Sequence, residues 1–91
     1  MFAMQARFPA SSVTIAGTSK TFVRIVENKT TFHFCPTCGG TVYYITEGAE
    51  DRIAVAVGAF ADPTFPAPTI SVFEARKHAW VEMPVDMKHL V

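Results

Sequence analysis

Short apolar stretches, separated by turn residues, recur along the whole chain. They are rich in Val, Ile, Thr, Phe and Tyr, and each ends at or near Gly, Pro, Asn or Asp. In the stretch 51–60, for example, Ile53, Val55 and Val57 fall on one face and small alanines on the other. A period of two residues, bounded by turn residues, is typical of β-strands.

No window of ten or more residues has the apolar period of a helix, and prolines spread along the chain would break most helices. We therefore predict one all-β domain over residues 1–91, with roughly six or seven strands in antiparallel sheets. Short helical turns are expected at 62–65 and 77–80. The expected strands are 3–8, 12–17, 20–27, 30–34, 40–46, 51–60 and 69–76.

The charge of the chain argues against several classes of partner. Lys and Arg number 8 and Asp and Glu number 8, so the formal net charge is zero. No global field draws the chain to nucleic acid or to an anionic membrane. No apolar run is long enough for a transmembrane helix, and the opening residues do not read as a signal peptide. We expect a cytoplasmic protein, and in that compartment a close cysteine pair is more often a metal or redox site than a structural disulfide.

Both cysteines, Cys35 and Cys38, lie in the segment HFCPTCGGTVYY. A redox pair of the thioredoxin type opens a helix, whose N-terminus lowers the pKa of the first thiol. Here Gly39 and Gly40 precede β-branched and aromatic residues, which predicts a turn into a strand. The flanking sequence therefore favours a metal-binding knuckle over a redox pair.

A zinc knuckle explains the residues around the thiols. Pro36 fixes the backbone after the first ligand, and the glycine after the second can take a positive φ, which turns backbone N–H groups toward the sulfurs. Structural zinc takes four ligands and catalytic zinc three plus an open position, whereas this chain has two thiols. A local disulfide or a pair of free thiols is the alternative.

The histidines do not complete such a site by their spacing. His33 precedes Cys35 by two residues on a predicted strand, where packing or exposure to solvent is the simpler role. His78 lies beside Trp80 in an expected surface turn, and His89 lies in the tail. Glu74 and Arg76 alternate on a predicted strand, which indicates a surface pair. The missing zinc ligands are therefore expected to be absent from this chain.

Three segments in order resemble a known family: HFCPTCGGTVYY, IAVAVGAFADP and FPAPTISVFEARKHAW. They carry the knuckle, the turn formed by Gly58, Asp62 and Pro63, and a strand that closes on Trp80. The chain resembles the carboxyl-terminal two-thirds of the glutathione-dependent formaldehyde-activating enzyme family, also called the centromere-protein-V-like domain. The opening segment 2–17 is similar to the family's paired strands before the knuckle.

The resemblance implies a β-tent fold, with antiparallel sheets around a Cys-x-x-Cys zinc knuckle. It also implies carbon–sulfur bond formation and cleavage on S-(hydroxymethyl)glutathione-type thiol adducts. In the family, a first Cys-x-Cys pair and the later Cys-x-x-Cys hold a structural zinc, and a Cys-x-Cys-x-x-Cys segment holds a catalytic zinc. Cys35 and Cys38 match the later half of the structural site. Ser71 stands where the family often has His.

The cysteine segments of the family that precede the knuckle are not in this sequence, so the other half of the site would lie upstream of Met1. The resemblance therefore implies a zinc-binding member of a lyase family without a catalytic zinc site, and no catalytic or cofactor-binding residue is assigned. Zinc at Cys35 and Cys38 is expected to be partial, or shared across a dimer. The alternative is a non-catalytic β domain, with at most a structural metal, that acts through self-association or protein binding. An uncovered sheet edge predicts a homodimer or a larger assembly.

Overall fold

The segments that alternate apolar and polar residues pair with one another in a computed structural model, which describes residues 3–91. The chain forms two compact units, Met4–Asp62 and Pro63–Val91, the second including Ala3.

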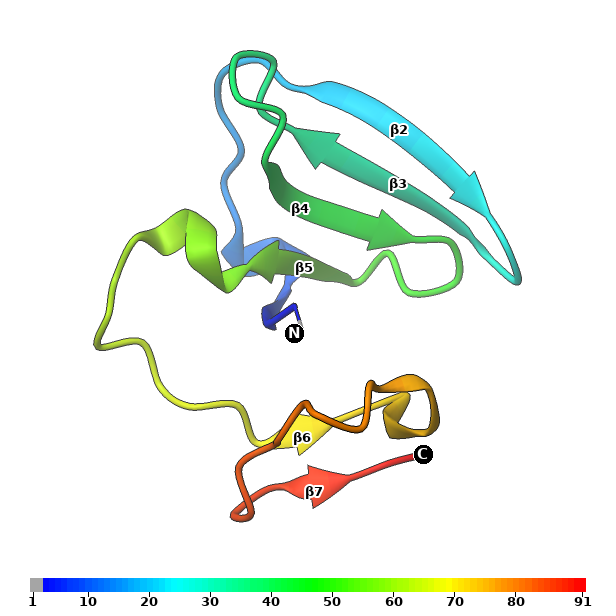
Figure 1. Ribbon diagram of the computed structural model, residues 1–91. Coiled ribbons are helices and arrows are strands. Elements are labelled where there is room, and N and C mark those ends of the chain that lie inside the picture. The colour runs from blue at the N-terminus through cyan, green and yellow to red at the C-terminus, as the bar shows by residue number, and fades with distance from the viewer. Residues whose placement is uncertain (1–2) are drawn as a thin grey trace. The chain divides into compact units, whose positions relative to one another are not determined.

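The first unit is a five-stranded antiparallel sheet with the strand order β1-β5-β4-β3-β2 (Figure 1). Two 3-10 turns accompany it, η1 (Ala10–Ser12) and η2 (Val57–Phe60). The strands are β1 (Gln5–Pro9), β2 (Lys20–Ile25), β3 (Lys29–Phe34), β4 (Thr41–Thr46) and β5 (Arg52–Ala56). Strands β2 to β5 follow one another as hairpins, and β1 lies beside β5 at one edge, which leaves β2 at the other.

A bulge lies where β4 leaves the knuckle. His33 pairs with Tyr43, but the next residue of β3, Phe34, pairs with Thr41, so Val42 is an extra residue on β4. Bulges bend a strand and redirect its side chains. This bulge lies at the end of the sheet from which the knuckle extends.

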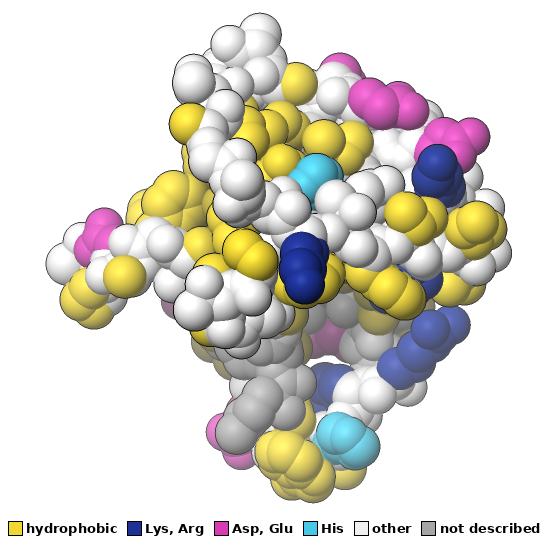
Figure 2. All heavy atoms as spheres, turned by 90° about the horizontal axis from the view of Figure 1, so that it is seen from above, with side chains coloured by type: hydrophobic (Ala, Val, Ile, Leu, Met, Phe, Trp, Pro, Cys, Tyr) yellow, Lys and Arg dark blue, Asp and Glu magenta, His cyan; other side chains and the backbone are white. Residues whose placement is uncertain are grey.

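The buried core of this sheet is small. Ile53 and Ala54 of β5 are each 5% exposed, and Thr30 is 6% exposed. Phe32 and Tyr44, which are cross-strand partners, have ring centroids 5.2 Å apart, and the Arg24 guanidinium lies 5.1 Å from the Phe32 centroid. By contrast, every residue of β2 is exposed. Figure 2 shows hydrophobic side chains at the surface in several places on the face that it displays.

The second unit has little regular structure. Strands β6 (Ile70–Ser71) and β7 (Lys88–His89) pair in parallel, and a 3-10 turn, η3 (Glu74–Arg76), follows β6. Val81 is 6% exposed in this unit. Among residues 3–91, no helix has the length and apolar character needed to cross a membrane.

The prediction of a mostly β, antiparallel structure is confirmed, and five of the expected strands correspond to β1 to β5. Segment 12–17 is not a strand: it continues from η1 without a partner edge, although Val13, Thr14 and Ile15 favour extended backbone. The last residues of 51–60 form η2 rather than strand, so Val57 does not extend the face of Ile53 and Val55.

The second unit also departs from the prediction. Of the expected strand 69–76 only Ile70–Ser71 forms, because Phe73 takes a left-handed φ of 59° that ends the extended backbone. Glu74 and Arg76 consequently lie in η3 and not on a strand. The parallel pairing of β6 and β7 differs from the antiparallel sheets expected throughout. The expected helical segments 62–65 and 77–80 contain turns but no helix.

Candidate metal centre

Cys35 and Cys38 lie on the turn that joins β3 to β4. The Cys35 N–H donates to the Gly40 carbonyl at 2.9 Å, and the Gly39 N–H donates to the Cys35 carbonyl at 2.8 Å. Gly39 takes a φ of +76°, in the left-handed region that favours glycine. The two hydrogen bonds close the turn, and the chain continues directly into β4, as the glycine pair predicts.

Backbone N–H groups point at the sulfurs. The Gly40 N–H donates to Cys38 Sγ at 3.5 Å. The backbone N–H of Cys38, followed in strength by that of Thr37, lowers the pKa of the Cys35 thiol below its ordinary value of 9.0. Hydrogen bonds to the thiolate stabilise the charged form, which is the form that binds metal. Both cysteines are free thiols; Cys35 is half-buried and Cys38 is exposed.

The knuckle fits half of a zinc site. A structural zinc is held by four ligands, and the two thiols of a Cys-x-x-Cys turn are two of them. Among residues 3–91 no group of three or more His, Cys, Asp or Glu side chains is placed to hold a metal. The chemistry of the two donors suits zinc, but the set of four is not completed by the described part of the chain, so we derive no reaction step through a metal.

His33 is held by other contacts. Its Nδ1 shares a hydrogen bond of 3.0 Å with Ser19 Oγ, and its ring stacks on Tyr43, with centroids 4.2 Å apart and planes 11° apart. The side chain is half-buried between these partners. His33 therefore helps to fix the base of the knuckle through β3 and β4.

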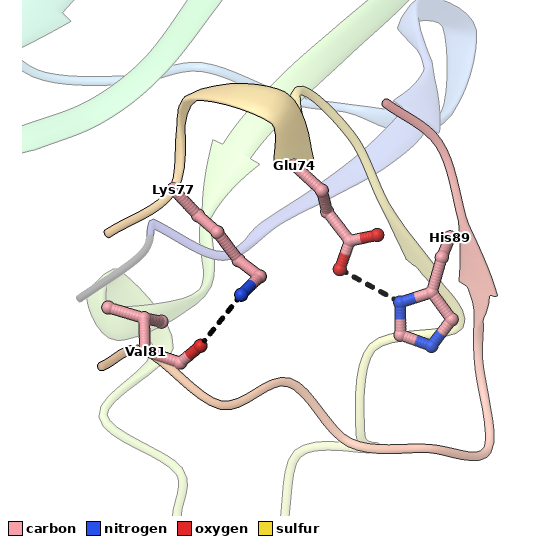
Figure 3. A network of polar contacts seen from close by, with 4 residues as sticks. All are labelled: Glu74, Lys77, Val81 and His89. Carbon is pink, nitrogen blue, oxygen red and sulfur yellow. Dashed lines mark hydrogen bonds and ion pairs between the residues drawn. The ribbon is translucent and has the colours of Figure 1, made fainter. Parts of the chain in front are cut away.

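The other two histidines lie in the second unit. His78 stacks on Trp80 with centroids 5.4 Å apart. His89, which the sequence placed in the tail, lies on β7, and its Nδ1 donates to Glu74 Oε1 at 2.8 Å (Figure 3). The hydrogen bond with His89 lowers the pKa of Glu74 below its ordinary value of 4.5. Figure 3 also shows Lys77 reaching the Val81 carbonyl, at 3.2 Å. No local pattern predicts the Glu74–His89 pair, because it depends on the pairing of two strands of two residues each.

A hollow of about 440 Å³ lies in the first unit, between the sheet and the segment after η1. Apolar side chains dominate its lining, and Ser12 and Thr14 add hydroxyls. Among the described residues that line it, none carries a charge. The lining residues are Phe8, Ser12, Val13, Thr14, Ile15, Ala16, Val42, Tyr43, Ile53, Val55 and Phe60. Segment 12–16 lines this hollow together with residues of β1, β4 and β5 and does not pair at a sheet edge, so the strand predicted for 12–17 does not form.

A comparison with family models matches residues 1–76 to the glutathione-dependent formaldehyde-activating enzyme. The chain belongs to this family. The match includes the knuckle and all of β1 to β5, which confirms the resemblance noted in the sequence, and it ends at Arg76. The match covers residues 65–76 of the segment that closes on Trp80, and the resemblance of residues 77–80 lies beyond it and stays a prediction. No curated protein and no solved structure matches the chain.

Proposed function

We propose that this member of the formaldehyde-activating enzyme family is a zinc-binding β domain, in which Cys35 and Cys38 supply two of the four ligands of a structural zinc site. The knuckle carries the proposal: two free thiols lie on one hydrogen-bonded turn, with backbone N–H groups directed at both sulfurs. Second-shell donors of this kind stabilise metal-bound thiolates. The other two ligands would come from a second thiol pair outside these 91 residues.

Under this proposal the 91 residues do not catalyse the reaction of the family, the formation and cleavage of carbon–sulfur bonds in S-(hydroxymethyl)glutathione-type adducts. A zinc ion that acts on such an adduct needs three protein ligands and one open position. The sequence contains two cysteines, and residues 3–91 bring no third ligand to them. We do not assign the hollow to glutathione, because its uncharged lining offers no partner to the carboxylates of glutathione.

The proposal also places the protein in the cytoplasm, since a free thiol pair persists in a reducing compartment. A second candidate is a non-catalytic β domain that acts by self-association. The exposure of every residue of β2, at an edge of the sheet, favours it. The two candidates are compatible, because the knuckle and the outer edge of β2 are different parts of the first unit.

Exchange between formaldehyde and glutathione, followed by two-dimensional exchange NMR at neutral pH, tests the catalytic part. The exchange rate with the 91-residue chain and zinc should equal the rate with the same zinc and no protein. A zinc-dependent acceleration that is lost in Cys35→Ala would contradict the proposal, because it would make the knuckle itself an active metal site. Ser19→Ala is a suitable control, since it removes a contact of His33 and leaves both thiols in place.

A further inference from the structure

The outer edge of β2 carries an inference that rests on the second candidate function, self-association, and specifies its interface. β2 is an edge strand of the five-stranded sheet, and all six of its residues are exposed. Its apolar side chains include Phe22, 60% exposed, and Ile25, 75% exposed. An exposed edge strand offers unpaired backbone N–H and C=O groups to another strand.

The hydrogen bonds of β3 identify the backbone groups of β2 that face outward. The Lys29 carbonyl accepts from the Glu47 N–H, and the Cys35 N–H donates to Gly40, so both residues face the β4 side. In an antiparallel ladder alternate residues face opposite neighbours. Thr30, Phe32 and Phe34 therefore face β2.

The cross-strand partners of those three residues are Arg24, Phe22 and Lys20. These three residues of β2 bond inward to β3. Thr21, Val23 and Ile25 consequently direct their N–H and C=O groups away from the sheet.

We propose that β2 of one copy pairs antiparallel with β2 of a second copy, about a two-fold axis at Val23. Opposite pairs along an antiparallel ladder alternate between bonded and non-bonded types, so an outward-facing residue must lie opposite an outward-facing residue. In a pair related by a two-fold axis, one residue therefore lies opposite the same residue of the second copy. With Val23 on the axis, Val23 bonds to Val23 of the second copy. On each side of the axis, Thr21 of one copy bonds to Ile25 of the other. All three outward-facing residues are then used.

The charges of β2 select this register. Only two two-fold registers pair five residues of β2, one with Phe22 on the axis and one with Val23. The first places Lys20 opposite Arg24 of the other copy, and like charges directly opposite are destabilising. The second places Arg24 opposite Phe22 of the other copy, where a guanidinium can lie over a ring. Within each chain Arg24 already lies 5.1 Å from the centroid of Phe32.

The dimer formed in this way does not complete the zinc site. Each knuckle begins beyond the pair formed by Lys20 and Phe34, which is three residues from the axis. At about 3.4 Å per residue, the two knuckles lie roughly 20 Å apart along the strands. Sulfurs that share one zinc lie about 2.3 Å from the ion. Dimerisation is therefore independent of zinc, and it is tested separately from the proposed function.

Light scattering coupled to size exclusion, at 100 µM chain with a chelator, gives the first test. The unaltered chain should be a dimer. Val23→Lys, which places two ammonium groups at the axis, should give a monomer. Val23→Pro removes an N–H that faces outward and should do the same, since proline is tolerated at such edge positions. Val85→Lys is the matched control, because Val85 is 86% exposed in the second unit, and this variant should stay a dimer.

Disulfide cross-linking tests the register, in a background with Cys35→Ser and Cys38→Ser. Val23→Cys should form a covalent dimer on oxidation, because Cα atoms of a bonded antiparallel pair lie about 5.5 Å apart, within the range of a disulfide. Ile25→Cys should not, since its two copies would lie about 14 Å apart along the strands. A monomeric unaltered chain, a dimer that survives Val23→Lys and Val23→Pro, or preferential cross-linking through Ile25→Cys or Phe22→Cys would overturn the proposal.

Discussion

Gly39→Ala is the substitution that tests the backbone of the knuckle most cleanly. Gly39 has a φ of +76°, and a Cβ built at this position meets no atom within 4 Å. Steric contact therefore contributes nothing to the effect, and any loss of stability comes from the left-handed backbone conformation alone.

The magnitude follows from two opposing terms. Holding a residue with a Cβ in the left-handed region costs about 1–2 kcal/mol. Replacing glycine by alanine also restricts the unfolded chain, which stabilises the folded state by about 0.4–1 kcal/mol. The net loss at Gly39 is therefore about 0–1.6 kcal/mol, centred on about 1 kcal/mol. Gly39→Asn should lose less, because asparagine tolerates this region better than alanine.

Gly58 offers a matched control in the same unit. A Cβ at Gly58 also meets nothing within 4 Å, and its φ is not in the left-handed region. Gly58 lies in η2, so Gly58→Ala keeps only the stabilising term. Because that term is common to both variants, the difference between Gly39→Ala and Gly58→Ala isolates the left-handed penalty, about 1–2 kcal/mol.

Urea unfolding followed by circular dichroism at the β-sheet band measures this difference. In thermal unfolding each kcal/mol corresponds to about 4–8 °C in Tm for a domain of this size. Equal stability of Gly39→Ala and Gly58→Ala would refute the reasoning, since it would mean that the knuckle does not hold Gly39 in the left-handed region. A Gly39→Asn variant less stable than Gly39→Ala would refute it as well.

Two further predictions concern packing and ionisation. Ile53→Ala should lower the free energy of unfolding by about 2–5 kcal/mol, because Ile53 is 5% exposed. Val85→Ala should change it by less than about 0.5 kcal/mol. Urea unfolding compares the two variants, and a similar effect at both sites would contradict the assigned core. Since the hydrogen bond with His89 lowers the pKa of Glu74, the stability it contributes is present above the ordinary pKa of 4.5 and is lost as the pH falls through the lower, folded value. His89→Ala should raise the Glu74 pKa in an NMR titration, and an unchanged pKa would exclude this pair.

Strands β2 to β5 of the first unit followed from local sequence because each has a partner close along the chain, whereas β1 followed from its own alternation although its partner β5 is distant. β2 to β5 form successive hairpins, so period-two alternation and turn residues were sufficient to predict them. The turn from the knuckle into β4 was likewise encoded locally, by Gly39 and Gly40 before Thr41 and Val42. The family assignment rested partly on the same segments, and the family match over residues 1–76 confirms it.

The elements that were mispredicted depend on contacts between distant residues. Val13 and Ile15 have strand-forming side chains, but a strand also needs a partner edge, and their segment instead lines the hollow over the sheet. Phe73 ends β6 by taking a positive φ, which phenylalanine rarely adopts. No local sequence pattern predicts this backbone conformation. The short strand at Lys88–His89 forms only because β6 lies beside it.

Metal analysis of the purified chain, with and without the knuckle cysteines, tests most directly whether Cys35 and Cys38 supply two of four zinc ligands. After dialysis we expect a zinc-to-chain ratio well below one, since two thiolates are half of the usual set. Cobalt added as a probe should show a thiolate-to-metal absorption band that disappears in Cys35→Ser and in Cys38→Ser and persists in His33→Ala. Stoichiometric zinc in a monomer, tightly held and lost in His33→Ala, would contradict the account, because it would show that this chain completes the site by itself.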